Sequence, residues 1–346
     1  MTLGVTVLIC TYNGSKRLPD TLAYLARQVV HERIDWEVLI VDNASTDNSA
    51  ETALSAWKKL GEPVPLRITN QPIPGLTPAK EKGLCEAKYE YVIICDDDNW
   101  LNPDFINRSY QLMNKNPDIG ILGGYGELVF EEDPPTWLEA YCIYASGPQA
   151  KKSGKVSHHK VYGAGSVIRR SAYQFILKAG FNSLLSDRMA AQLTSGGDHE
   201  FCYAMVLAGY DIWYDEELKF KHFIAKDRIS WEHYMRYIRE SATCFEVLEP
   251  YKILVNSPDP QEATLMPELA RSFFYHLRKL LPTWWSYQLQ KPRSRTYYAN
   301  LIQHILLRTR LQSYYLPNGL KQLKLNFQKV KEYHKSLLKN IGQPVN

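Results

Sequence analysis

Residues 91–100 read YVIICDDDNW, so three consecutive carboxylates directly follow a short apolar stretch that is typical of a buried strand. Like charges repel one another, and a solvated loop seldom needs three of them in a row. A divalent cation such as Mg²⁺ or Mn²⁺, which prefers oxygen ligands, best accommodates Asp96, Asp97 and Asp98 together. A solvated turn before a helix is the alternative. An EF-hand is excluded because leucine and asparagine stand at 101 and 107, where glycine and glutamate are needed.

The 125 residues around this stretch alternate short apolar runs with amphipathic segments. Strands are expected at 5–10, 37–41, 66–70 and 91–95, and helices at 17–29, 48–60, 77–87 and 103–114. This alternation predicts an α/β, Rossmann-like fold whose mostly parallel sheet has helices on both faces. Such sheets bind ligands at the carboxyl ends of their strands, where polar clusters stand at 11–13, 42–47 and 96–98. We therefore expect one shared crevice.

The rest of the chain divides into two parts. Periodicity is weak over 126–170, where we expect a lid or acceptor loop, and returns in a strand at 163–168 and a helix at 201–208. After about residue 225 the pattern is helical and is interrupted by prolines. We expect an α/β domain over 1–225, with halves at 1–125 and 126–225, followed by a helical region over 226–346.

The charge of the chain is unevenly distributed. From residue 271 to 346 there are 14 Lys or Arg and one acid, a balance of +13, so a total of +4 leaves −9 for residues 1–270. The basic part is rich in aromatic residues, which fits an interfacial helix on anionic lipid. It equally fits a helical unit that packs on the α/β domain or on a second subunit, as in a homo-oligomer. No DNA- or RNA-binding motif accompanies the charge, so no nucleic-acid partner is expected.

The cysteines and the apolar runs indicate the compartment. The six cysteines show no CxxC pair and no zinc spacing, and they are expected to be reduced core thiols. A strand begins almost at the first residue, and no stretch reaches the roughly 18 apolar residues of a membrane span. We expect a cytoplasmic protein, with the inner face of the membrane as a further option.

Three segments together resemble the nucleotide-sugar half of family 2 glycosyltransferases with the GT-A fold: TVLICTYNGSKRLPDTLAYLARQ, EVLIVDNASTDNS and YVIICDDDNWLNPDFI. The resemblance covers residues 1 to about 225 and rests on the order and spacing of the motifs. It implies that Thr11, Tyr12 and Asn13 line the nucleobase and ribose pocket and that Asp42 meets the base. A turn-forming role is the alternative for Asp42. The triplet 96–98 would be the DXD element, with Asp96 and Asp97 at the donor and Asp98 on the metal.

Two further segments resemble the family but depart from it. PGLTPAKEKGL, residues 74–84, has Lys-Glu where the family usually has Arg-Asn, so Lys80 keeps a cation for the diphosphate while Glu81 adds a charge. GGDHEF, residues 196–201, resembles the ED motif with Gly197 in place of the first acid. The resemblance makes Asp198 the catalytic base and Glu200 an orienting or acceptor-binding neighbour. A helix cap at Asp198 is the alternative.

Two smaller features complete the resemblance. YGAGSVIRR, residues 162–170, resembles the glycine loop before the catalytic segment and places Gly165 at the substrate. His222 falls where GT-A enzymes often have a histidine that completes the metal shell, although a lone histidine on a strand is as often simply packed.

Together these features predict a metal-dependent, inverting glycosyltransferase that uses Mn²⁺ or Mg²⁺. It would move a sugar from a nucleoside-diphosphate donor to a hydroxyl of a surface-glycan or lipid-linked acceptor. Because Gly197 and Glu81 depart from the family pattern, a catalytically silent nucleotide-sugar-binding protein is the alternative.

Overall fold

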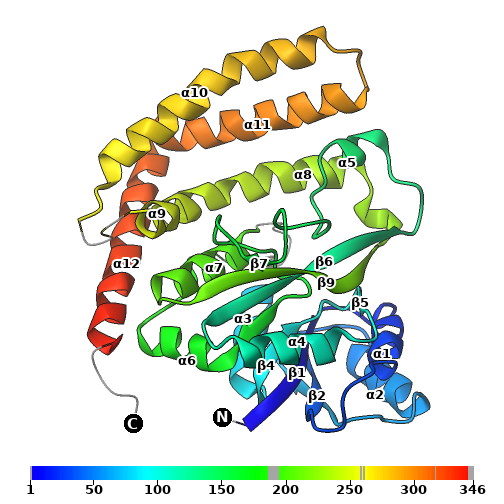
Figure 1. Ribbon diagram of the computed structural model, residues 1–346. Coiled ribbons are helices and arrows are strands. Elements are labelled where there is room, and N and C mark those ends of the chain that lie inside the picture. The colour runs from blue at the N-terminus through cyan, green and yellow to red at the C-terminus, as the bar shows by residue number, and fades with distance from the viewer. Residues whose placement is uncertain (1, 186–194, 258, 260–261, 316, 342–346) are drawn as a thin grey trace.

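Four strand–helix units form the N-terminal half of the computed structural model, which describes residues 2–185, 195–257, 259, 262–315 and 317–341 (Figure 1). Every strand and helix expected over the first 125 residues is present, and no end differs from the expectation by more than three residues. A short extra strand follows the acidic turn. The elements are β1 (Thr2–Thr11), α1 (Leu18–Ala26), β2 (Trp36–Asp42), α2 (Ser49–Lys59), β3 (Leu66–Asn70), α3 (Leu76–Glu86), β4 (Tyr89–Ile94), β5 (Asn99–Leu101) and α4 (Phe105–Lys115).

The first four strands are parallel and bring their carboxyl ends to one edge. β1 pairs with β2 and β4, and β2 pairs with β3, with Thr11 opposite Asp42 in the register. Loops that leave these ends are therefore neighbours, as the prediction of a shared crevice requires.

The second half of the sheet is mixed rather than parallel. The elements of this part of the chain are β6 (Ile119–Phe130), α5 (Thr136–Ala140), β7 (Gly154–Lys155), β8 (Val167–Arg169), α6 (Arg170–Lys178), α7 (Gly197–Leu207) and β9 (Asp211–Ile224). The order is β3-β2-β1-β4-β8-β6-β9-β5, with β7 on β9, and β8, β5 and β7 pair in antiparallel fashion. The strand expected at 163–168 is shorter, because residues 163–166 form the loop before β8.

Helices cover both faces of the sheet, as expected. Alternate residues of a strand point to opposite faces. Thus Val7 and Ile9 pack with α1, α2 and α4, while Leu8 packs with α3, α6 and α7. Two buried layers result, and the crevice lies at the strand ends between them.

The C-terminal region is a set of helices that share a core with the sheet domain. After the 3₁₀ turn Lys226–Arg228 come α8 (Trp231–Ser241), the turn Ala242–Cys244, α9 (Phe245–Val255), α10 (Leu265–Leu289), α11 (Arg295–Tyr315) and α12 (Pro317–Ile341). Aromatic side chains of α9 and α12 join the core of α7, and the Tyr333 hydroxyl donates to the Ala204 carbonyl at 3.1 Å. Packing on the α/β domain, one of the two expectations, therefore occurs. The boundary near residue 226 stays a prediction.

The hairpin of α10 and α11 forms an outer layer of the molecule (Figure 1). The outward face of α10 exposes Phe274, Leu281, Trp285 and Leu289, each by more than half of its surface. None of the described helices is long and apolar enough to cross a bilayer.

The cysteines only partly meet the expectation of core thiols. All six are free, and Cys95 and Cys202 are buried. Cys85 and Cys142 are exposed, so the expectation was wrong for these two. Cys85 stands at the solvent side of the last turn of α3 and Cys142 in the loop after α5, positions that local apolarity did not reveal.

Candidate active site

The acidic turn connects β4 to β5 and is tightly built. The Asn99 amide donates to the Asp96 carbonyl at 2.9 Å, and the Asp96 amide donates to the Asn99 side chain at 3.2 Å. The pairing of β5 with β9 then places Asn99 opposite His222. The turn thus brings its carboxylates beside a histidine more than 120 residues away in sequence.

Asp97 is held by protein partners. Its carboxylate accepts hydrogen bonds from Arg17 Nε and Nη2, both at 2.8 Å, and from Thr11 Oγ1 at 2.6 Å. The hydrogen bond to Asp97 also raises the pKa of Arg17. Both oxygens of Asp97 and the hydroxyl of Thr11 therefore join the first loop to the acidic turn. The donor contacts expected of these two residues stay predictions.

Asp98 and His222 face one another across a gap suited to a cation. His222 Nδ1 lies 3.1 Å from the Ala145 carbonyl, which assigns the N–H to Nδ1 and leaves the Nε2 lone pair toward Asp98. Nε2 is 3.6 Å from Asp98 Oδ1, too far for a hydrogen bond. The donor set of one carboxylate and one imidazole, whose other ring nitrogen contacts the Ala145 carbonyl, fits Mn²⁺ or Mg²⁺.

Arg228 occupies the other oxygen of Asp98. Its Nη1 is 2.7 Å from Oδ2, and its guanidinium lies 4.9 Å from the ring centre of Tyr144. Over the described ranges no cluster of three or more His, Cys, Asp or Glu side chains could hold a metal. A cation here would therefore take two protein ligands and complete its shell with diphosphate oxygens and water, as Mg²⁺ commonly does.

The loops after β1 and β2 are joined where the nucleobase is expected. Asn13 has a left-handed backbone, with φ of 50°, and its side-chain oxygen accepts from the Thr46 amide at 2.8 Å. Asp42 accepts from the Ser45 amide at 3.1 Å, the turn-forming role given as its alternative. Tyr12 is 56 % exposed, so its ring is open to a stacking ligand.

The glycine loop before β8 forms the floor between Lys80 and Asp198. The Gly165 amide donates to the Ile94 carbonyl at 2.9 Å, which fixes the loop beside the end of β4. A Cβ at Gly163 would lie 3.4 Å from Lys80 Nζ and 3.3 Å from Asp198 Cβ. Only glycine leaves this space open between the ammonium and the carboxylate.

Asp198 lies in the first turn of α7, but it is not the N-cap. Gly196 takes that position with φ of 108°, so the capping alternative is wrong. Instead, the carboxylate accepts from the Gly163 amide and from the His199 amide, both at 2.9 Å. These bonds fix its orientation toward the glycine loop.

The surroundings keep Asp198 ionised. Burial alone would raise its pKa, but His199, Lys80 and the two amide donors together hold the pKa below its ordinary value. Burial lowers the pKa of His199, and the Lys80 ammonium is a further cation beside the Asp198 carboxylate. An ionised carboxylate can accept a proton.

Glu200 stands two residues further along α7 and is fully buried. Its carboxylate accepts from the Ser183 hydroxyl at 2.9 Å and from the amides of Leu184 and Leu185 at 2.8 and 3.0 Å. Of the two roles expected for Glu200, this favours the orienting neighbour, because no atom of the side chain is open to an acceptor.

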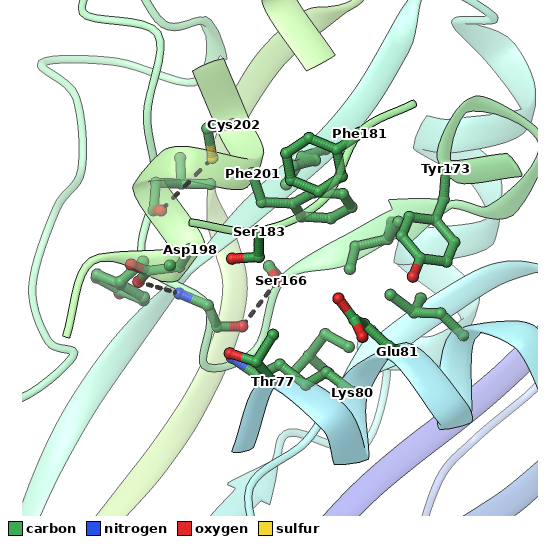
Figure 2. Close-up of a pocket in the computed structure, with 18 residues that line it drawn as sticks. Thr77, Lys80, Glu81, Ser166, Tyr173, Phe181, Ser183, Asp198, Phe201 and Cys202 are labelled. Atoms are coloured by element: carbon green, nitrogen blue, oxygen red, sulfur yellow. Dashed lines mark hydrogen bonds between the residues drawn. The ribbon is translucent and has the colours of Figure 1, made fainter. Parts of the chain in front are cut away.

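A cavity opens beside Asp198 and Lys80 and extends between α3, α6, α7 and the sheet (Figure 2). Neither this cavity nor the ion pairs of Arg17 and Arg228 were foreseen. The sequence does carry a signal for the cavity, since Glu81 and Gly197, the two departures from the family pattern, both line it.

The chain matches a family model and several curated proteins. The model of glycosyl transferase family 2 matches residues 6–177. The poly(ribitol-phosphate) beta-N-acetylglucosaminyltransferase TarS of Staphylococcus aureus is 26 % identical over 198 residues, which cover 53 % of this chain and 34 % of TarS. Glycosyltransferase GlyG of Streptococcus pneumoniae is 30 % identical over 122 residues, which cover 35 % of this chain and 38 % of GlyG. The matches thus span little more than a third of these curated relatives.

Solved structures extend the likeness to almost the whole chain. TarS 1–349 of S. aureus in complex with UDP-GlcNAc superposes with a TM-score of 0.54 at 15 % identity, covering 96 % of this chain and 92 % of that one. The mannosyltransferase PcManGT of Pyrobaculum calidifontis, in complex with GDP-Man and Mn²⁺, gives 0.55 at 16 % identity, covering 90 % and 88 %. Fold and family model agree, and the chain belongs to glycosyltransferase family 2, with the GT-A fold.

Proposed function

We propose that the protein is a metal-dependent, inverting glycosyltransferase that moves a sugar from a nucleoside diphosphate to a hydroxyl of a surface-glycan or lipid-linked acceptor. The observation that carries this proposal is the arrangement around the glycine loop. The ionised carboxylate of Asp198 and the ammonium of Lys80 meet at Gly163. This loop adjoins the end of β4, from which the turn with Asp98 departs.

Each side chain has a role in a single displacement. Asp198 accepts the proton of the acceptor hydroxyl while the acceptor oxygen attacks the anomeric carbon. The bond from that carbon to the diphosphate oxygen breaks on the opposite face, and the electron pair leaves with the nucleoside diphosphate. Lys80 faces the charge that develops on the diphosphate. Asp98 and His222 would hold the cation, whose chemistry is Lewis-acid stabilisation of the departing diphosphate.

The relatives support the donor class. TarS has been solved with UDP-GlcNAc and PcManGT with GDP-Man and Mn²⁺, so nucleoside-diphosphate sugars and a divalent cation occur on this fold. Several relatives have names that refer to polymers, among them poly-beta-1,6-N-acetyl-D-glucosamine synthase of Staphylococcus epidermidis. A surface-polysaccharide acceptor is consistent with the names of these relatives.

We further propose that the protein works at the inner face of an anionic membrane. The outward face of α10 carries the exposed Phe274, Leu281 and Trp285 next to Arg271 and Arg278. Apolar side chains bordered by cations suit the headgroup region of a bilayer. Co-sedimentation of the full chain with phosphatidylglycerol vesicles tests this. Leu281→Glu should reduce the bound fraction, and binding by the parent that is equal on neutral vesicles would contradict it.

Calorimetry tests the donor site directly. We expect one of UDP, GDP and CDP to bind in the presence of Mn²⁺, and the binding to disappear with EDTA or in Asp98→Asn. Asp104→Asn is the matched control, because this exposed carboxylate lies at the start of α4, close to the turn but outside the proposed metal site. Silence of the parent toward all three nucleotides would refute the proposed donor site.

The catalytically silent alternative needs its own experiment. The departures at Glu81 and Gly197 motivate it. Asp198→Asn should lower the rate of sugar transfer by about 10²–10⁴ while the nucleotide still binds with parental affinity. If the parent binds nucleotide but hydrolyses or transfers no donor sugar under any condition, the binding protein becomes the better description.

A further inference from the structure

The cavity beside Asp198 is small and mostly apolar. Its volume is about 70 Å³, enough for a few water-sized groups and too small for a sugar ring. Figure 2 shows Phe181 and Phe201 on one side of it and Lys80 and Asp198 toward the catalytic side. Leu84, Ile94, Ile121 and Ile168 supply further apolar wall.

Two polar groups face this apolar space without protein partners. Tyr173 is 2 % exposed, and its hydroxyl has no hydrogen-bond partner among the residues that the structure describes. The half-buried Glu81 makes no hydrogen bond or ion pair within the described part of the chain, and burial raises its pKa. A buried hydroxyl without a partner costs roughly 1–3 kcal/mol, so such groups in native proteins generally meet water or a ligand.

The cavity also coincides with both departures from the family motifs. Gly197, in place of the first acid of the ED motif, lies at its Asp198 end, and Glu81, in place of asparagine, lies in its wall. Because glycine has no side chain, position 197 adds no carboxylate to the one that Asp198 already supplies at this end. The chain has therefore exchanged a charged group for apolar space at one specific point beside the catalytic carboxylate.

We propose that this cavity receives an acylamino substituent of the transferred sugar. The inference rests on the proposed function, since it places the sugar between Lys80 and Asp198. An acetamido group has a methyl for the apolar wall, a carbonyl that accepts from the Tyr173 hydroxyl and an N–H that donates to Glu81. A hydroxyl or an ammonium substituent would leave most of the apolar wall uncovered, although an ammonium would find a partner in Glu81.

Binding of matched donors tests the inference. Calorimetry with Mn²⁺ compares UDP, UDP-glucose and UDP-N-acetylglucosamine, which differ only in the sugar and its 2-substituent. We expect the N-acetyl donor to bind about tenfold more tightly than UDP-glucose, the equivalent of one net hydrogen bond. If UDP binds and the two UDP-sugars bind with equal affinity, the inference is wrong and the proposed function is unaffected. Failure of these three compounds and of GDP and CDP to bind would overturn both; where GDP or CDP binds instead of UDP, the same comparison uses the glucose and N-acetylglucosamine donors of that nucleotide.

Variants identify the groups responsible. Tyr173→Phe removes a hydroxyl that has no protein partner, so the variant should fold with parental stability and lose most of the preference for the N-acetyl donor. Gly197→Glu should reverse the preference by filling the entrance. Tyr110→Phe, on α4 and on the opposite face of the sheet, is the matched control and should change nothing. If the cavity holds only water, Tyr173→Phe leaves the affinity for every donor unchanged, and the inference fails.

Discussion

Replacing Arg228 by methionine should lower the thermal stability of the metal-free protein and raise its affinity for Mn²⁺. In the structure Arg228 Nη1 binds Asp98 Oδ2 at 2.7 Å, while Oδ1 faces His222. The Asp98 side chain is 9 % exposed and that of Arg228 is 21 % exposed, so the pair is largely desolvated. A cation bound at Asp98 Oδ1 would compete with Arg228 at Oδ2 for the charge of the same carboxylate, and the two interactions therefore oppose each other.

The size of the effect follows from the pair. A hydrogen bond to a charged group contributes about 1.5–3 kcal/mol when it is withdrawn from water. Taking about 2 kcal/mol, the variant should unfold about 4 °C lower in EDTA, at about 2 °C per kcal/mol for a chain of this size. The same 2 kcal/mol, no longer spent on displacing Arg228, corresponds to about 30-fold tighter Mn²⁺ binding.

Two measurements check this prediction. Thermal unfolding in EDTA reports the lost ion pair, and the electron paramagnetic resonance signal of free Mn²⁺ reports the affinity. Arg236→Met is the matched control, because Arg236 is paired with Glu240 on the exposed side of α8 and should change neither quantity. A variant that loses stability but keeps the parental Mn²⁺ affinity would refute the reasoning, since the cation would then not compete with Arg228 for Asp98.

Three further predictions concern the catalytic loop. Asp198→Asn should lower turnover by about 10²–10⁴ and leave the donor affinity unchanged, as expected for loss of a general base. Steady-state kinetics and calorimetry check this, and a fall in donor affinity without a fall in turnover would contradict it. The pKa of Asp198 is held below its ordinary value of 3.8, so the base stays ionised down to that pH. Lys80→Met removes a cation that lowers this pKa and should therefore move the acidic limb of the pH–rate profile to higher pH. An unmoved limb would contradict the assignment of Asp198 as the base. Gly165→Ala should lower the free energy of unfolding by about 1–3 kcal/mol more than Gly180→Ala, as measured by chemical unfolding. Both glycines have a positive φ, but only a Cβ at 165 would lie 2.5 Å from Phe220. Equal losses of stability would show that the loop moves to make room for the methyl group.

The sequence predicted the first half of the fold well, for a local reason. Each strand from β1 to β4 is an uninterrupted apolar run between turn residues, and each following helix is amphipathic. The second half depends on pairings between distant segments. β5 is only three residues long and forms by pairing with β9, and β8 is shortened by the loop that holds Gly165. No local pattern encodes such partners.

The same distinction applies to the site. The family motifs pointed to Asp98, His222 and Asp198 from the sequence alone, and the roles of these three residues stay predictions. Arg17 and Arg228 could not be predicted, because a lone cation in a loop gives no sign of the carboxylate that it will meet 80 or 130 residues away. The sequence likewise marked Glu81 and Gly197 as unusual residues but could not reveal that both line one cavity.

The two arginines also determine what an approaching nucleotide meets. Three carboxylates alone would repel a diphosphate, but Arg17 lies on Asp97 and Arg228 on Asp98, which leaves about one net negative charge on the turn. The electrostatic barrier to encounter is therefore low even before a cation arrives. If the proposed cation binds Asp98, Arg228 would lie beside the incoming phosphate with less of its charge held by the carboxylate.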